Sequence, residues 1–149
     1  MSEHSIRLEW TAEPHSQKEG TYSRDHKAII SSGVTIPVSA APDYLGNESL
    51  ADPEQLLVNA LASCHMLYFL AICEGSGYTV DTYVDNAVGR VARSEEGFHW
   101  VSEIVLRPRA TFRSEKQPTH AQLERLHHRA HKGCFIANSI KSKVIVELD

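Results

Sequence analysis

The stretch DPEQLLVNALASCHMLYFLAI, residues 52–72, constrains the fold of this 149-residue chain more than any other segment. Asp52 is a favourable helix N-cap, and Gln55 completes a capping box with it. No further glycine or proline interrupts the pattern until two glycines close it. The stretch therefore predicts one helix over Pro53–Glu74, on the order of 33 Å long.

Apolar side chains cover every side of this predicted helix. They are Leu56, Leu57, Val58, Leu61, Met66, Leu67, Tyr68, Phe69, Leu70 and Ile72. A membrane span needs roughly 20 such residues, but Asn59, Ser63 and His65 would place polar groups at the costly centre of the bilayer. A helix with apolar side chains on every side and a few polar residues half-way along its length is better explained as the buried core helix of a protein outside the membrane.

The composition is that of one domain, residues 1–149, with a substantial core, since 42% of the residues are hydrophobic. A net charge of −4 argues against nucleic acid as a partner. The first ten residues lack a basic segment followed by an apolar one, so we expect no signal peptide and a cytoplasmic location. In that compartment the three cysteines are expected to be reduced or redox-active rather than a disulfide framework.

The remaining chain predicts mainly strands, and Ile6, Leu8 and Trp10 show the alternation of a half-buried strand. The expected strands are Ser5–Trp10, Thr21–Ser31 (which would carry Arg24), Val34–Val38, Tyr78–Val91, Phe98–Phe112 and Lys143–Leu148. Thr119 and Gln122 form a second capping box, which predicts a helix to about Lys132, and Phe135–Ile140 fits a short helical turn. The order β-β-β-α-β-β-α-(α)-β indicates an α+β fold. Because about six strands cover only part of an all-apolar helix, we expect a two-fold homodimer.

Cys64 and Cys134 are the candidate reactive groups, in mid-helix and just after the second helix. A buried cysteine can be simply a small apolar residue, which is the favoured interpretation of Cys73; for Cys64 both interpretations stay open. A reactive thiolate needs a nearby cation or hydrogen-bond donors, and Arg24 is the best candidate. Glu54, about 15 Å along the helix from Cys64, either stabilises the helix dipole or approaches Cys64 of a partner chain.

The histidines allow two further interpretations. His127 and His131 have the i, i+4 spacing of a metal-binding pair, but no firm third ligand accompanies them, and HHRAHK also fits a solvated basic helix end. We therefore predict no metal site. His65 cannot point the same way as Cys64, so it is expected to be a core histidine or a pocket wall.

Two cysteine-centred motifs, PEQLLVNALASCHM and AHKGCFIANSI, and the terminal KVIVEL strand resemble the OsmC/Ohr family of thiol-dependent hydroperoxide reductases. The similarity runs from about Ile6 to Leu148. It implies a homodimer with intertwined sheets around two central helices and active sites at the interface. It also implies that Cys64 is the peroxidatic thiol and Cys134 the resolving thiol, and that Glu54 and Arg24 in YSRDH match the glutamate and arginine of the family.

The resemblance implies a chemistry without a bound cofactor. Cys64 would attack an organic hydroperoxide or hydrogen peroxide, Cys134 would form a disulfide with it, and an external dithiol, for example of the lipoyl type, would reduce the pair. An apolar lining would favour organic hydroperoxides; its residues are Met66, Tyr68, Phe69 and Phe135. The chain departs from the family pattern in Phe135, which replaces a frequent proline, in a longer segment between the cysteines, and in N-terminal strands without a glycine-rich hairpin.

Two other classes of function remain compatible with the sequence. One is a non-catalytic dimer that binds a small apolar ligand in the same pocket, with cysteines that do not react. The other is a metal-binding protein that uses the histidine-rich helix and Cys134.

Overall fold

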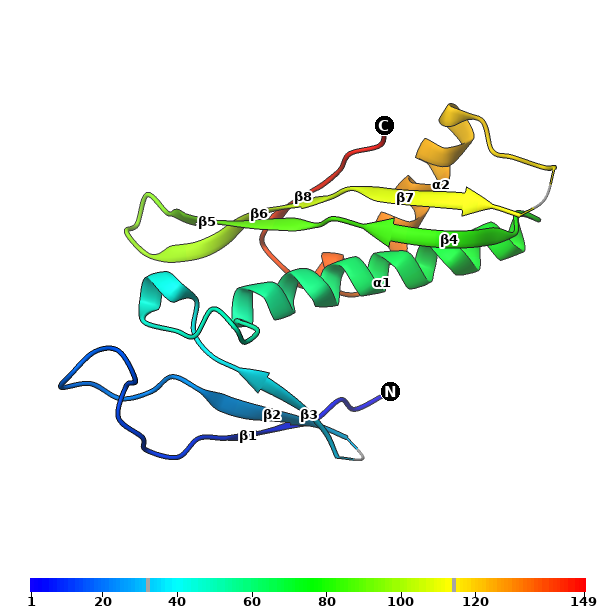
Figure 1. Ribbon diagram of the computed structural model, residues 1–149. Helices are drawn as coiled ribbons and strands as arrows, with labels where there is room; N and C mark the ends of the chain where they lie inside the picture. Colours follow the sequence, from blue (N-terminus) through cyan, green and yellow to red (C-terminus); the bar gives the residue numbers. More distant parts are fainter. Residues whose placement is uncertain (32, 114) are drawn as a thin grey trace. The chain divides into compact units, whose positions relative to one another are not determined.

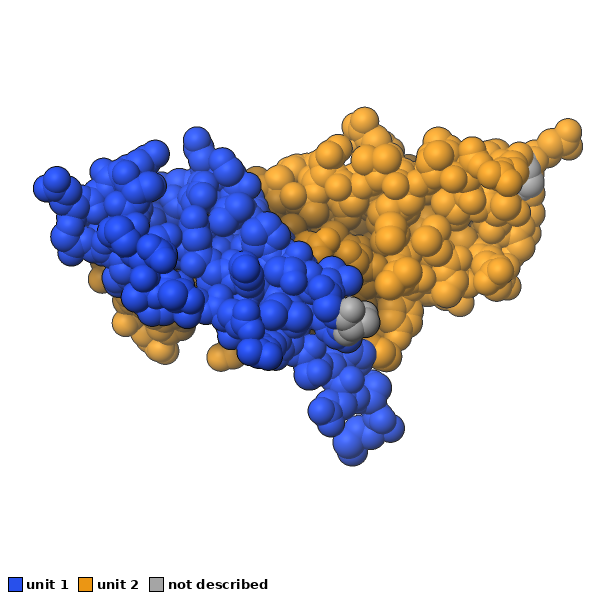
Figure 2. Space-filling model, turned by 60° about the horizontal axis from the view of Figure 1, so that its bottom comes forward, with its two compact units in different colours: residues 1–56 blue, residues 57–149 orange. Residues whose placement is uncertain are grey.

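The computed structural model describes residues 1–31, 33–113 and 115–149, and it has the predicted α+β character (Figure 1). The chain forms two compact units, Met1–Leu56 and Leu57–Asp149 (Figure 2).

The first unit is built on a three-stranded antiparallel sheet in the order β1-β2-β3. Its strands are β1 (Ile6–Glu9), β2 (His26–Ile30) and β3 (Val34–Val38). Pro37 lies on β3 at the edge of this sheet, as predicted. A proline has no N–H to donate, so it suits a strand that pairs with a neighbour on one side only. A short 3₁₀ helix, η1 (Pro42–Tyr44), follows. A Cβ on the next glycine, Gly46, would lie 1.5 Å from the carbonyl oxygen of Ala40, so this close approach requires glycine.

The central helix α1 (Pro53–Gly75) begins at the predicted capping box. Gln55 N–H donates to Oδ1 of Asp52 over 2.7 Å, and Oε1 of Gln55 accepts from Asp52 N–H over 3.1 Å. The fully buried residues of α1 lie along one row with a four-residue spacing: Leu61, His65, Phe69 and Cys73. The other apolar residues of the helix are half-buried or, like Leu67, exposed.

The two long strands predicted after α1 are instead four shorter ones. These are β4 (Val80–Asp85), β5 (Val88–Arg93), β6 (His99–Leu106) and β7 (Pro108–Phe112). β4 pairs with β7, whereas β5 pairs with β6 in a separate sheet. Each arm of the hairpin therefore changes sheets, at residues 86–87 and at Arg107. Oδ1 of Asp85 accepts the Arg107 N–H over 2.7 Å at this point, and Pro108 offers no N–H to continue the ladder.

The last strand, β8 (Lys143–Val146), pairs in parallel with β6. Before it comes α2 (His120–Gly133), which begins at the predicted Thr119–Gln122 capping box, and η2 (Ala137–Ser139), the predicted short helical turn. Two core clusters hold this unit together. The first packs Leu61 of α1 on Ile104 and Leu106 of β6 and on Cys134, and the second packs Phe69 and Cys73 of α1 on Leu126 and Ala130 of α2.

By length and composition alone, α1 could cross a membrane, with a mean hydropathy of 1.9. A single helix of this kind is weak evidence for a span. The row of buried residues at four-residue spacing is the pattern expected of a core helix.

Candidate functional site

Cys64 and Cys134 meet in the first core cluster of the second unit. Cys64 is half-buried in the middle of α1, and Cys134 is fully buried immediately after α2. The two thiols lie close enough for Cys64 to raise the pKa of Cys134. The backbone of Cys134 is fixed on both sides, since its N–H donates to the Ala130 carbonyl over 3.0 Å and its carbonyl accepts from Asn138 N–H over 3.1 Å. The structure thus brings together two thiols that are 70 positions apart in sequence.

The environment of Cys134 keeps this thiol protonated. Burial is the largest effect and, with the hydrogen bond to Cys64, raises the pKa of Cys134 to about 11. The backbone N–H of Ala137, which donates to Sγ of Cys134 over 3.4 Å, lowers this pKa only in part. At neutral pH, Cys134 is therefore a neutral S–H group that can donate to Sγ of Cys64.

A glycine at the end of α2 allows the two cysteine-bearing segments to approach. A Cβ at Gly133 would lie 2.7 Å from two ring carbons of Tyr68, which is one turn beyond Cys64 on α1. Real Cβ atoms essentially never come so close. The Tyr68 ring thus packs directly on the α2 backbone beside Cys134.

The residues predicted to line a substrate site fall into two groups. Tyr68 and Phe135 form an edge-to-face pair beside the cysteines, with ring centroids 5.6 Å apart, and Phe135 is 71% exposed. Phe69 instead lies fully buried in the second core cluster, where its ring stacks on His127 at 4.1 Å. Met66 is half-buried on α1. The structure places only Tyr68 and Phe135 at the thiol pair.

Arg24 lies in a loop and not on the predicted strand, since β2 begins only at His26. Local hydrogen bonds between side chains and nearby groups take the place of strand pairing around Arg24. The Arg24 guanidinium donates to Oγ1 of Thr21 over 3.1 Å and to the Tyr22 carbonyl, and it lies 4.1 Å from the centroid of the Tyr22 ring.

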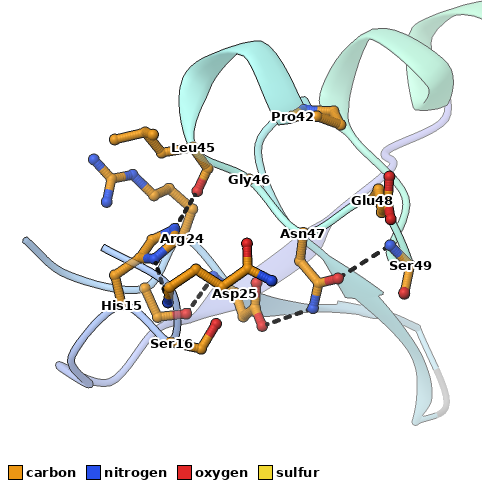
Figure 3. Close-up of a pocket in the computed structure, with 12 residues that line it drawn as sticks. His15, Ser16, Arg24, Asp25, Pro42, Leu45, Gly46, Asn47, Glu48 and Ser49 are labelled. Carbon is orange, nitrogen blue, oxygen red and sulfur yellow. Dashed lines mark hydrogen bonds between the residues drawn. The ribbon is translucent and has the colours of Figure 1, made fainter. Parts of the chain in front are cut away.

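Arg24 also lines a polar pocket of about 470 Å³ in the first unit (Figure 3). Loop residues around positions 15–17, 23–25 and 42–49 form its walls, and Asp25 accepts a hydrogen bond from the Asn47 amide over 3.2 Å. Glu54 lies in the first turn of α1. Among the described residues Arg24 and Glu54 form no ion pair with each other.

The sequence did not reveal that two histidines form a buried pair between α1 and α2. His65, expected to be a core histidine or a pocket wall, is fully buried, and its Nε2 lies 3.0 Å from Nδ1 of His127 on α2. His127 is 2% exposed, so a solvated helix end was the wrong interpretation for it. Four-residue spacing places His127 on the same face of α2 as Leu123 and His131. This spacing was the signal in the sequence that could have indicated the burial of His127. Within the described parts of the chain, no group of three or more histidine, cysteine or acidic side chains is arranged to hold a metal ion.

Cys73 differs from the other two cysteines. It is fully buried in the second core cluster, and burial raises its pKa to about 11. The structure thus surrounds Cys73 with apolar side chains, away from the cluster that holds Cys64 and Cys134.

A family model described as OsmC-like protein matches residues 46–149 of the chain. The chain belongs to the OsmC-like protein family. The structure of an OsmC-like protein of unknown function from Vibrio cholerae is 41% identical, with 100% of both chains covered and a TM-score of 0.93. No curated protein matches the chain. The predicted family and fold class are therefore confirmed.

More distant structures show the same fold at low identity. An organic hydroperoxide resistance protein OsmC from Legionella pneumophila is 15% identical, with a TM-score of 0.74 over 99% of this chain and 96% of its own. The organic hydroperoxide resistance protein OhrB of Bacillus subtilis is 14% identical, with a TM-score of 0.73 over 99% and 98%. At these identities the two structures show that the fold is shared.

Proposed function

We propose that this OsmC-like protein is a thiol-dependent hydroperoxide reductase in which Cys64 attacks the peroxide and Cys134 resolves the product. The observation that carries the proposal is the packing of these two thiols in one core cluster, close enough for Cys64 to raise the pKa of Cys134. A purely structural core has no need of two thiols in contact. Two distant relatives named organic hydroperoxide resistance proteins agree with this chemistry.

The proposed reaction has two balanced steps. The Cys64 thiolate attacks one peroxide oxygen, the O–O bond breaks, and the alkoxide leaves to take a proton from solvent, so Cys64 becomes a sulfenic acid and the peroxide becomes an alcohol. The Cys134 sulfur then attacks the sulfenic sulfur, a disulfide forms, and water leaves with the Cys134 proton. A dithiol supplied from outside reduces this disulfide by exchange and is itself oxidised to a disulfide.

The two cysteines divide these roles because of their surroundings. Cys64 is half-buried and therefore reachable by a peroxide, whereas Cys134 is fully buried and protonated. The Tyr68–Phe135 pair supplies an apolar wall beside the thiols, which favours organic hydroperoxides over hydrogen peroxide.

In this proposal a homodimer completes each site. The exposed apolar side chains of α1, such as Leu67 at 61% exposure, support a second copy of the helix as the cover of that face. Glu54 lies about 15 Å along the helix from the Cys64 of its own chain, so Glu54 would act on Cys64 of the partner. Arg24 would stabilise the thiolate, and Glu54 would orient the guanidinium. We place the protein in the cytoplasm, where thiols stay reduced.

The test is intact-protein mass spectrometry after one equivalent of an organic hydroperoxide. We expect loss of two hydrogens and a Cys64–Cys134 cross-link in peptide maps. Cys64→Ser should abolish consumption of the peroxide. Cys134→Ser should consume one equivalent and trap a sulfenic acid on Cys64, which a second equivalent would oxidise to a sulfinic acid. Thiols that stay inert would contradict the proposal and favour the alternative, a non-catalytic dimer that binds a small apolar ligand.

The roles of Arg24 and Glu54 need a separate measurement. Arg24→Lys keeps the charge but removes the planar guanidinium, which can form two parallel hydrogen bonds with a carboxylate. We therefore expect this variant to reduce peroxide turnover at least tenfold. Glu54→Ala should act in the same direction. Full turnover in both variants would show that other residues activate Cys64.

A further inference from the structure

A buried pair of histidines joins the two helices that carry the reactive cysteines. His65 on α1 and His127 on α2 are 0% and 2% exposed. Nε2 of His65 and Nδ1 of His127 are 3.0 Å apart, and the two rings are parallel within 2°. The Phe69 ring stacks on His127 with centroids 4.1 Å apart. A polar contact inside the core thus links α1 to α2.

The same contact lies next to the thiol pair in the chain. His65 directly follows Cys64, and Cys134 is seven residues, about two turns, beyond His127. A change in the distance between α1 and α2 at the histidines therefore moves the segment that holds Cys134 relative to Cys64.

The hydrogen bond between the rings depends on their protonation. Two neutral imidazoles can share it, because one nitrogen donates and the other accepts. When both rings are protonated, both facing nitrogens are donors and the bond is lost. Nδ1 of His65 is also buried without a hydrogen-bond partner among the described residues, so a positive charge on this ring has no compensation there.

The titratable groups around the pair come from several elements. They are Cys73 on α1, His120, Glu124, His128 and His131 on α2, Tyr83 and Asp85 on β4, and Glu147 after β8. The carboxylates among them have other partners. Glu124 pairs with His120 at 3.4 Å, and Glu147 pairs with Arg107 at 2.7 Å. Asp85 accepts the Arg107 N–H through Oδ1, whereas its Oδ2 is buried without a hydrogen-bond partner among the described residues. Burial, and next the charge of His131, lower the pKa of His65 to about 4. Burial, and next the charge of His65, lower the pKa of His127 to about 3.

We propose that the His65–His127 contact is an acid-sensitive connection that holds Cys134 against Cys64, and that protonation of the pair separates α2 from α1 and uncouples the two thiols. The folded pKa values lie below the ordinary value of 6.5, so an opened state binds more protons. The stabilisation is therefore complete above pH 6.5 and is lost as the pH falls towards 4. This device goes beyond the proposed peroxide chemistry, because it acts on the thiol pair without any peroxide.

The experiment is hydrogen–deuterium exchange of the whole protein between pH 7.5 and 4.5, with rates corrected for intrinsic exchange. In the wild-type protein, the opening of residues 120–134 should become about 15-fold more frequent between pH 6.5 and 5 for each proton taken up. The double variant His65→Leu/His127→Phe replaces the pair by apolar groups of similar size and should change less than about threefold. His128→Gln removes an exposed histidine of the same helix and should keep the wild-type response.

Two results would overturn the proposal. One is an unchanged acid response in the double variant, and the other is no acid response of residues 120–134 in the wild-type protein. If the double variant does not fold, NMR titration of the ring protons in the wild-type protein provides the test: titration of both rings near pH 6.5, or protonation without faster exchange, contradicts it. Since these measurements need no peroxide, a failure of the proposed reductase activity would leave their outcome unchanged.

Discussion

Substitution of Gly133 by alanine tests whether close packing of the helices sets the rate of disulfide formation. A Cβ at this position would lie 2.7 Å from the Tyr68 ring, whereas carbon atoms prefer about 3.5–4.0 Å. Either the ring or the end of α2 must therefore move by about 1 Å. Overpacking of this kind costs about 1–3 kcal/mol, and the higher helix propensity of alanine offsets about 1 kcal/mol. The net loss of stability should thus be about 0–2 kcal/mol.

The effect on the thiols should be larger than the effect on stability. Cys134 directly follows Gly133, and a displacement of about 1 Å between reacting groups can lower a rate about 100-fold. We expect Gly133→Ala to form the Cys64 sulfenic acid at the normal rate and the Cys64–Cys134 disulfide roughly 10- to 100-fold more slowly. Quenched-flow mass spectrometry with a sulfenic-acid trap separates the two steps.

A matched control and a compensating change make this prediction sharp. Gly75→Ala also changes the last residue of a helix, but nothing lies within 4 Å of its Cβ, so disulfide formation should stay normal. Tyr68→Leu combined with Gly133→Ala should restore part of the rate by making room. If Gly133→Ala forms the disulfide as fast as Gly75→Ala, the packing of Tyr68 on α2 does not position Cys134.

Three further predictions concern stability and assembly. Cys73→Ser should lower the free energy of unfolding by about 1–3 kcal/mol, because it buries a hydroxyl among apolar side chains, while peroxide turnover stays intact. Asp52→Ala removes the 2.7 Å cap hydrogen bond to Gln55 and should cost about 1 kcal/mol in urea unfolding. Leu67→Glu should convert a dimer to monomers in analytical sedimentation, and a wild-type monomer at micromolar concentration would contradict the dimer.

Local signals in the sequence predicted much of the fold. Both capping boxes mark the true helix starts, because an N-cap residue and its partner three positions later form a complete motif within four residues. The short turn after α2 and the edge position of Pro37 were likewise predicted from residues close together in the sequence. The exchange of partners in the hairpin at Arg107 was missed, because pairing of β4 with β7 and β5 with β6 depends on contacts far apart in the chain.

In the candidate site, too, local motifs were predictive, whereas contacts between residues far apart in the sequence were missed. The motifs around Cys64 and Cys134 pointed to the two thiols, and the structure places both in one core cluster. Arg24 was assigned to the predicted strand Thr21–Ser31, but hydrogen bonds to Thr21 and Tyr22 hold it in a loop. The contact between His65 and His127 joins residues 62 positions apart. No pattern within a single helix can reveal such a partner.

The complete burial of Cys134 also determines how a disulfide at this site could be opened. An incoming thiolate must reach a sulfur atom in line with the S–S bond, and of the two only Cys64 is partly exposed. Attack at Cys64 makes Cys134 the leaving group, and a sulfur whose conjugate thiol has a raised pKa leaves slowly. A single thiol would thus form a mixed disulfide at Cys64, beside a Cys134 that can displace it again. A dithiol escapes this reversal, because its second sulfur displaces Cys64 within the same encounter.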